Sequence, residues 1–238
     1  MLETRQATFT FIRHGESQGN VRPVWAGQTD DELSELGKEQ ANALGEWFAE
    51  NETKFDRIYV SKLKRARQTA EAIQHHANPT PPLIEEQSLH EIDFGDADGK
   101  PYVADPIRGH SLEEHYKEGI YPHIHNRTDR FPGGESKDDV ARRAERVIQD
   151  LIIPMITKDT TDTHIAIVSH GVFLKELFYE LHRQSGELVQ YKCLDTTGWT
   201  RMKINILKLQ GREDVRLPII LEVMHVNKRE HWPTRTER

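Results

Sequence analysis

The sequence contains a single cysteine, Cys193. This excludes an internal disulfide and a zinc site built on several thiolates. The sequence also lacks any apolar run of about 18 residues, the length that a helix needs to cross a bilayer. Its first residues, 1–8, are largely polar and contain no apolar core of a signal peptide. These absences favour a reducing compartment, and we expect a cytoplasmic protein.

Positive charge is in deficit. The chain has 32 lysines and arginines against 39 aspartates and glutamates, which gives a formal net charge of −7. Nucleic acids and anionic membranes bind basic faces, so we expect neither as the main partner. A small-molecule partner fits better, and an anionic one must meet a locally basic pocket. The oligomeric state is left open.

The 238 residues show no internal repeat, low-complexity tract or linker, which favours one domain over residues 1–238. Runs typical of strands alternate with helical patterns, as in a three-layer α/β/α sandwich with a mostly parallel central sheet. Two late strand patterns predict an antiparallel edge hairpin, followed by a loose tail at 227–238. The predicted strands cover 7–13, 55–60, 82–84, 164–169, 199–209 and 217–226. The predicted helices cover 34–51, 62–73, 111–118, 136–152 and 172–182.

Serine residues mark several predicted helix starts, because a serine oxygen accepts a hydrogen bond from a free N–H of the first turn. Ser111 is followed three residues later by Glu114, which predicts a capping box. Pro154 predicts a kink or a stop near the end of the fourth helical stretch. The serines expected as caps are Ser34, Ser61, Ser111 and Ser136.

Arg13 and His14 stand where the first predicted strand becomes a glycine-containing loop. In an open α/β sheet, ligands bind at the carboxyl ends of the strands. The arginine can hold an anion there while the histidine reacts with it. A second histidine, His170, also ends an apolar strand and is also followed by a glycine, Gly171. Two such histidines favour a functional site over two unrelated structural residues.

Four segments at fixed positions carry a family resemblance. The first contains Arg13, His14, Gly15, Glu16, Ser17 and Asn20. The second contains Ser61, Leu63, Arg65, Ala66, Gln68, Thr69 and Ala70. The third contains Leu89, Glu91 and Gly95, and the fourth contains Val168, His170 and Gly171. Together they resemble the histidine phosphatase superfamily, also called the phosphoglycerate mutase-like family, in its mutase/phosphatase branch. The turn Pro132-Gly133-Gly134-Glu135-Ser136 is similar to one common in the broad-specificity phosphatase members.

The resemblance implies a phosphomonoesterase that hydrolyses a small phosphorylated metabolite through a phosphohistidine on His14. It places the general acid/base at Glu91. It implies neither a metal nor another cofactor, because two arginines can balance the charge of a phosphate. The residues expected to bind the phosphate and the substrate are Arg13, Asn20, Gln28, Arg65, His170 and Gly171.

This chemistry sets the expected charge states. His14 must be neutral at its attacking nitrogen, and a hydrogen bond from the other ring nitrogen to the Gly15 carbonyl would fix that tautomer. His170 is expected to be protonated beside the phosphate. Glu91 is expected to have a raised pKa, because it must give a proton to the leaving oxygen and later take one from water.

Alternatives stay open for the acid and for the reaction. Asp93, Asp96 and Asp98 compete with Glu91, and their other role is in solvated turns. A cofactor-dependent phosphoglycerate mutase would use the same phosphohistidine. Mutases of the family carry an adjacent arginine pair that binds the substrate carboxylate, whereas residues 92–107 contain Lys100 as their basic residue. A non-catalytic phosphate-binding protein on the same fold is a second alternative.

Residues 92–135 form the least regular stretch of the sequence. They contain several prolines and four histidines, none in the spacing of a known metal motif. Long irregular segments in compact domains are often functional, so we expect an insertion that shapes the substrate site. The four histidines are His110, His115, His123 and His125.

Overall fold

A six-stranded mixed sheet forms the centre of the computed structural model, which describes residues 2–103, 106–158, 163–209 and 218–232. The strand order is β3-β2-β4-β1-β5-β6. Strands β1 to β4 pair in parallel, whereas β5 pairs antiparallel with both β1 and β6. The strands are β1 (Leu2–Arg13), β2 (Arg57–Val60), β3 (Leu83–Glu85), β4 (Thr163–Ser169), β5 (Trp199–Leu209) and β6 (Ile219–Lys228). The predicted parallel sheet with an antiparallel edge pair is confirmed.

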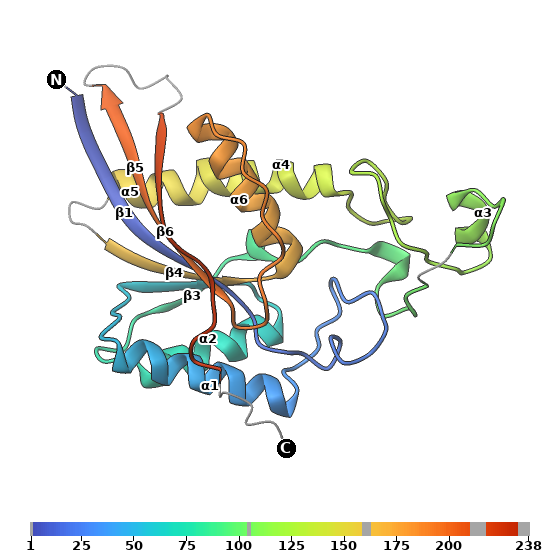
Figure 1. Cartoon of the computed structure of the whole chain (residues 1–238), viewed down its shortest axis with the longest axis horizontal. Coiled ribbons are helices and arrows are strands. Elements are labelled where there is room, and N and C mark those ends of the chain that lie inside the picture. Colours follow the sequence, from blue (N-terminus) through green and yellow to red (C-terminus); the bar gives the residue numbers. More distant parts are fainter. Residues whose placement is uncertain (1, 104–105, 159–162, 210–217, 233–238) are drawn as a thin grey trace.

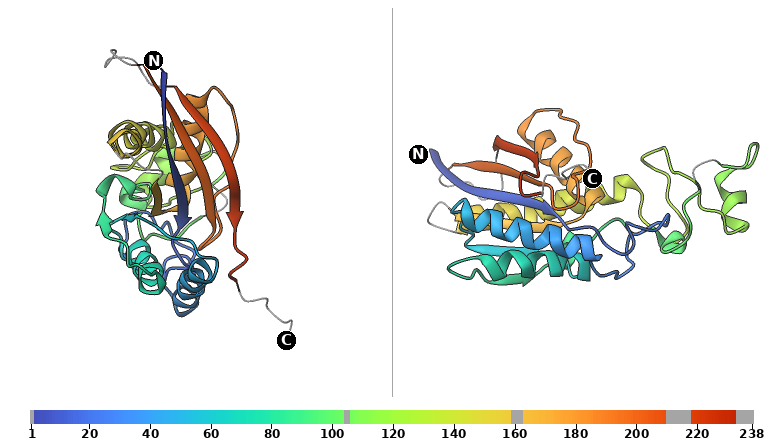
Figure 2. Two further views of the ribbon diagram at one scale, coloured as in Figure 1. Left: turned by 90° about the vertical axis from the view of Figure 1, so that its left-hand side faces the viewer. Right: turned by 60° about the horizontal axis from the view of Figure 1, so that its bottom comes forward.

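Helices cover both faces of this sheet (Figures 1 and 2). One face carries α1 (Glu35–Glu50) and α2 (Lys64–His76), and the other carries α4 (Lys137–Val147), α5 (Ile153–Lys158) and α6 (Gly171–Ser185). The short α3 (Leu112–Lys117) lies in the segment that extends away from the sheet. Two 3-10 turns, η1 (Gln87–Leu89) and η2 (Gly95–Ala97), follow β3. The expected three-layer sandwich is therefore confirmed.

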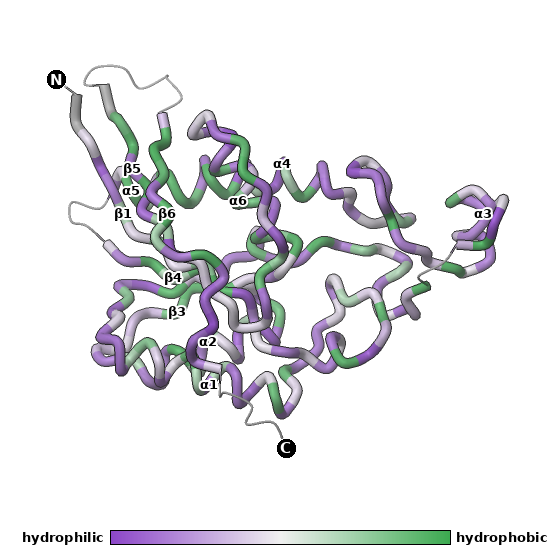
Figure 3. The backbone as a smooth tube through the Cα atoms, in the orientation of Figure 1, coloured by the Kyte–Doolittle hydropathy of each residue, from purple (hydrophilic) through white to green (hydrophobic). Residues whose placement is uncertain are grey.

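Alternating side chains of the central strands enter two separate cores. In β4, Ile165 and Ile167 pack with α4, α5 and α6, whereas Ala166 and Val168 pack against α1 and α2. Successive residues of a strand point to opposite faces, so a strand covered on both sides must be apolar throughout. Figure 3 shows these hydrophobic positions gathered along the central strands.

Three of the four expected serine caps are present. The Ser34 oxygen accepts from the Gly37 N–H, and Ser111 and Ser136 each form a complete capping box. The expectation for Ser61 is wrong: α2 begins after Leu63 and has no side-chain cap. The Ser61 hydroxyl instead lies 2.8 Å from Nε2 of His170, because β2 and β4 bring the two residues to the same edge.

The helix does not stop at Pro154. It passes through a π-helical turn, Ile148–Ile152, and continues as α5, with Pro154 in the first turn of α5. A π turn shifts the hydrogen-bond pattern, and a proline is tolerated where its missing N–H has no partner to lose.

Residues 227–232, expected as the start of a loose tail, are held in place. Asn227 and Lys228 belong to β6, and His231 is buried. The His231 Nε2 and the Trp232 Nε1 each lie 2.9 Å from the Thr197 hydroxyl. Residues 233–238 of the predicted tail lie outside the described residues. The sequence pattern is polar there, but it does not reveal that the rings of His231 and Trp232 reach the Thr197 hydroxyl.

No helix among the described residues is long and apolar enough to cross a membrane. The cytoplasmic location expected from the sequence stays a prediction.

The Ser136 capping box at the start of α4 yields a stability prediction. Ser136→Ala removes the acceptor for the Asp139 N–H. We expect it to lower the free energy of unfolding by about 1 kcal/mol in urea unfolding. Ser111→Ala is the matched control, since it removes the same kind of box from the six-residue α3. The loss of free energy of unfolding should be smaller for Ser111→Ala, because α3 is short and lies away from the sheet. Equal losses for the two variants would contradict this expectation.

Candidate active site

Parallel pairing brings the two strand-end histidines together. Arg13 of β1 lies in register with Ser169 of β4, so His14 and His170 follow their strands at the same edge of the sheet. The ring centroids of the two histidines are 5.1 Å apart. Ser61 follows β2 at that edge as well. The site thus sits at the carboxyl ends of parallel strands, where ligands bind in open α/β sheets.

His14 is buried and is held by its neighbour in sequence. Its Nδ1 lies 2.6 Å from the Gly15 carbonyl oxygen, as expected from the sequence. A carbonyl oxygen only accepts, so Nδ1 is the donor and a neutral His14 carries its lone pair on Nε2. Burial, followed by the charges of Arg65 and Arg13, lowers the pKa of His14 well below its usual value. His14 is therefore a neutral base with a free ring nitrogen.

The loop after His14 is anchored to the helices below it. The Gly15 N–H donates to the Thr69 hydroxyl of α2 at 3.0 Å. A β-carbon at Gly15 would lie 2.6 Å from the carbonyl oxygen of Gly37, so only glycine fits against the start of α1. These contacts fix the position of His14 relative to α2, which also carries Arg65.

Two arginines approach the histidines. Arg65 is 1 % exposed, and its guanidinium donates to the carbonyls of Thr29 at 2.6 Å and Gly27 at 2.7 Å. Arg13 donates to the Leu194 carbonyl at 2.7 Å. A carbonyl oxygen orients a guanidinium without removing its charge. The site therefore keeps a concentration of positive charge in an acidic protein, which suits a phosphate.

His170 differs from the expectation. Burial, then Arg65, His14 and Arg13, lower its pKa well below the usual value. The chain's own surroundings therefore favour a neutral His170, and the expectation that it is protonated beside a bound phosphate stays a prediction. Its Nε2 lies 2.8 Å from the Ser61 hydroxyl. Among the described residues, its Nδ1 and the Arg13 Nε are buried without a hydrogen-bond partner. Both atoms can serve an anion at this edge.

Glu91 lies at the amino end of α6. Its carboxylate accepts from the N–H groups of Ile92 (2.9 Å), Val172 (3.0 Å) and Phe173 (2.9 Å). The side chain is 8 % exposed. Three backbone N–H groups, two of them in the first turn of α6, therefore fix the position of this carboxylate.

The competing aspartates serve the turns of this segment. Asp98 accepts from the N–H groups of Gly27 and Gln28, and Asp93 accepts from that of Gly95. Burial raises the pKa of Asp98, and these N–H groups oppose the shift. Asp96 is exposed. Asp93 and Asp98 therefore have structural partners, whereas Glu91 lies at the start of the helix that follows His170.

The remaining expected binding residues take different positions. Asn20 is exposed, and its side-chain oxygen accepts from the Ser17 N–H and hydroxyl, which leaves the amide nitrogen as its donor. Gln28 donates to the Glu91 carbonyl at 2.7 Å, and its expected role in binding the substrate stays a prediction. A β-carbon at Gly171 would lie 3.4 Å from Nε of Arg13, so this glycine lets the arginine pass close to α6.

A cavity of about 250 Å³ adjoins Glu91. Ile92 and Val172, whose N–H groups hold the Glu91 carboxylate, are part of its wall. Aromatic residues from two loops and the chain's one cysteine complete that side: Trp25, Phe94 and Cys193. Charged residues of both signs also line it: Lys137 and Lys175, and the acidic Asp129, Glu135 and Glu176. This cavity offers space for the organic part of a ligand whose charged group lies at the histidines.

The four histidines of the 92–135 segment are not arranged as a metal site. Within the described ranges, no cluster of three or more histidine, cysteine or acidic side chains has the geometry to hold an ion. His115 instead accepts from the Ile107 N–H at 2.7 Å. The segment forms a small aromatic cluster of its own around Tyr121 and Phe131.

The fold and the site define a class: an α/β protein whose parallel strands present two histidines and two arginines at one edge. The chain belongs to the histidine phosphatase superfamily, branch 1, since the model of that family matches residues 9–212. The resemblance drawn from the four sequence segments is confirmed.

Relatives of this chain have two kinds of activity. It is 30% identical to a 2,3-bisphosphoglycerate-dependent phosphoglycerate mutase of Bartonella bacilliformis over 190 residues, 79% of this chain and 88% of the relative. It is 31% identical to an uncharacterised phosphatase, PhoE, of Bacillus subtilis over 183 residues, 74% of this chain and 78% of the relative. A mycobacterial glucosyl-3-phosphoglycerate phosphatase has the same fold, with a TM-score of 0.63 at 22% identity, covering 94% of this chain and 100% of that one.

The lowered pKa values of both histidines predict a pH-dependent stability. Below about pH 6.5, these histidines bind protons in the unfolded chain but stay unprotonated while they are buried in the folded chain. The free energy of unfolding should therefore fall as the pH drops through 6.5, by at most about 1.4 kcal/mol per pH unit for each histidine.

Urea unfolding between pH 8 and pH 5 measures this dependence. His14→Gln and His170→Gln should each reduce the slope below pH 6.5, whereas His75→Gln, at an exposed position of α2, should leave it unchanged. Equal slopes in all four proteins would contradict the buried neutral state.

Proposed function

We propose that the protein is a metal-independent phosphomonoesterase that acts on a small phosphorylated metabolite. The observation that supports this best is His14: a buried, neutral imidazole with its Nδ1–H bound to a carbonyl and two arginines beside it. Such a group is a nucleophile for phosphorus placed where a phosphate dianion is attracted. A purely structural histidine would not need two arginines beside it.

In the first step, Nε2 of His14 attacks phosphorus in line. The N–P bond forms as the P–O bond to the organic group breaks, and protonated Glu91 gives its proton to the leaving oxygen. In the second step, Glu91 takes a proton from water, the water oxygen bonds to phosphorus, and the N–P bond breaks. Inorganic phosphate and neutral His14 result.

Fixed donors stabilise the charge that spreads over the phosphoryl oxygens during transfer. Arg13 and Arg65 supply forked N–H pairs, and Asn20 and the Gly171 N–H add further donors. A phosphate dianion beside His170 opposes the effect of burial and of the arginines on its pKa. The protonated His170 expected from the sequence is thus a property of the complex in this proposal.

The cavity beside Glu91 receives the leaving group. Its wall combines aromatic and aliphatic side chains with two lysines and three acidic residues, which suits a small metabolite with a partly apolar body and polar groups. The 92–135 segment supplies Phe94 and His123 to this wall, in keeping with a role in shaping the substrate site.

The mutase alternative draws support from the Bartonella relative. A mutase needs cations that are available to hold the substrate carboxylate. Two arginines after residue 92 have other partners: Arg127 pairs with Glu176 at 2.7 Å and Arg130 with Asp139 at 2.8 Å. This pairing favours hydrolysis over phosphoryl return to a second hydroxyl.

Hydrolysis of an aryl phosphate in EDTA tests the proposal. Wild type should be active, and His14→Ala should lose essentially all of the activity because the nucleophile is gone. His75→Ala, an exposed histidine on α2, is the control and should match wild type. Activity that survives in His14→Ala, or that disappears from wild type in EDTA, would overturn it.

Phosphoglycerate separates the two reactions. The protein is incubated with 3-phosphoglycerate and 2,3-bisphosphoglycerate, and the products are monitored by phosphorus NMR. We expect release of inorganic phosphate and little 2-phosphoglycerate. Dominant formation of 2-phosphoglycerate would establish the mutase. Binding of phosphate without either product would instead support the non-catalytic alternative.

A further inference from the structure

Arg143 is an arginine of α4 that the sequence motifs do not single out, and every one of its N–H groups has a partner. Nη1 donates to the carbonyls of Ser88 (3.0 Å) and His90 (2.8 Å), and Nη2 donates to the Glu91 carbonyl at 3.2 Å. Both carboxylate oxygens of Glu135 accept from the guanidinium, at 3.1 Å from Nε and 2.8 Å from Nη2. The side chain is 6 % exposed. A buried arginine thus binds three carbonyls of the segment that ends in Glu91.

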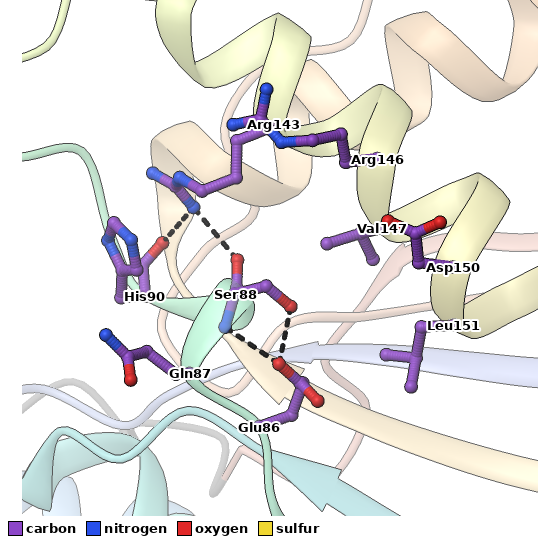
Figure 4. A pocket seen from close by; sticks show the side chains of 9 residues that line it. All are labelled: Glu86, Gln87, Ser88, His90, Arg143, Arg146, Val147, Asp150 and Leu151. Carbon is purple, nitrogen blue, oxygen red and sulfur yellow. Dashed lines mark hydrogen bonds between the residues drawn. The ribbon is translucent and has the colours of Figure 1, made fainter.

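On the side that faces Arg143, this segment is not closely packed. Leu89 is buried in the core, but residues 86–88 and 90 face a cavity of about 440 Å³ that Arg143 also lines. Figure 4 shows Arg143 reaching from its helix to the backbone oxygens of Ser88 and His90. Hydrogen bonds to the guanidinium therefore hold the backbone where side-chain packing does not.

Arg143 also contacts the group that holds the Glu91 carboxylate. Its guanidinium lies over the ring of Phe173, 4.8 Å from the centroid. The Phe173 N–H donates to Oε1 of Glu91. One side chain therefore touches both the main-chain carbonyl of Glu91 and the residue that receives its carboxylate.

Glu135 completes the arrangement on the other side of Glu91. Its Oε2 accepts from the Asp93 N–H at 3.0 Å, and its own N–H donates to the Asp93 carbonyl at 2.7 Å. The carboxylate also balances the charge of the buried guanidinium. The Arg143–Glu135 pair thus fixes the backbone before and after Glu91.

We propose that Arg143, paired with Glu135, is the positioning residue for proton transfer by Glu91. The proposal rests on the phosphomonoesterase function above. A general acid acts only within hydrogen-bond reach of the leaving oxygen, and a small displacement can cost about 100-fold in rate. The fork of Arg143 sets that distance. A lysine keeps the charge but cannot reach three carbonyls and a carboxylate in one plane.

Substrates with different leaving groups test this. An alkyl phosphate needs protonation of its leaving oxygen, whereas 2,4-dinitrophenyl phosphate releases a stable phenolate without it. The ratio kcat/KM reports the first phosphoryl transfer and leaves out the later hydrolysis step. Arg143→Lys should lower kcat/KM for the alkyl phosphate by about 10- to 100-fold and leave that for the dinitrophenyl ester nearly unchanged. Glu91→Gln should show the same selectivity.

The double variant Glu91→Gln/Arg143→Lys gives the sharper readout. Because Arg143 acts through Glu91 in this proposal, the kcat/KM of the double variant toward the alkyl phosphate should be no lower than that of Glu91→Gln alone. Arg146→Lys, an exposed position on the same helix and the same cavity, is the matched control and should resemble wild type. Glu135→Gln should repeat the selective loss in a second way if Arg143→Lys does not fold.

Equal losses with both esters, or additive losses in the double variant, would overturn the positioning role. That outcome is distinct from failure of the phosphomonoesterase proposal, which would appear as activity remaining in His14→Ala.

Discussion

Parallel pairing of β1 with β4 is the constraint on which the rest of the site depends. The register that places Arg13 opposite Ser169 puts two histidines from distant parts of the chain at one edge. Pairing of β2 with β4 then brings the Ser61 hydroxyl to His170, and α2, which follows β2, carries Arg65 to the same place. A slip of one residue in this register would turn every side chain of the strand to the other face and separate these groups.

Charge is the second theme of the site. Backbone carbonyls orient Arg65 and Arg13, so the guanidinium groups keep their full charge while they lose most contact with water. Their field and the burial of the rings lower the pKa of both histidines. The arrangement suits a nucleophile that must stay unprotonated and an anion that must be drawn in. Among the described residues, no carboxylate is hydrogen-bonded to His170. In the proposed mechanism, a bound phosphate would therefore supply the negative charge that favours its protonated form.

The contacts that hold Glu91 are separate from those that hold His14. Glu91 leans on the amino end of α6, on Gln28 and on the Arg143–Glu135 pair, and none of these contacts involves His14. Gln28, expected among the substrate-binding residues, also donates to the Glu91 carbonyl. His14 and Glu91, the nucleophile and the acid of the proposed mechanism, are therefore held by different elements.

Local chemistry was determined by the sequence itself. The caps at Ser34, Ser111 and Ser136 and the His14–Gly15 hydrogen bond join residues at most three positions apart, so the chain's covalent geometry settles them. The alternation of apolar strand runs with helical patterns indicated the α/β fold. The spacing of the four motif segments indicated the family. Only the tertiary structure decided the partner of Ser61, the neutral state of His170, the donors of Glu91 and the contacts of Arg143. The contacts of Ser61 with His170, of Glu91 with Val172 and of Arg143 with Glu91 join residues 109, 81 and 52 positions apart. Their approach is set by sheet register and helix packing, which no local pattern encodes.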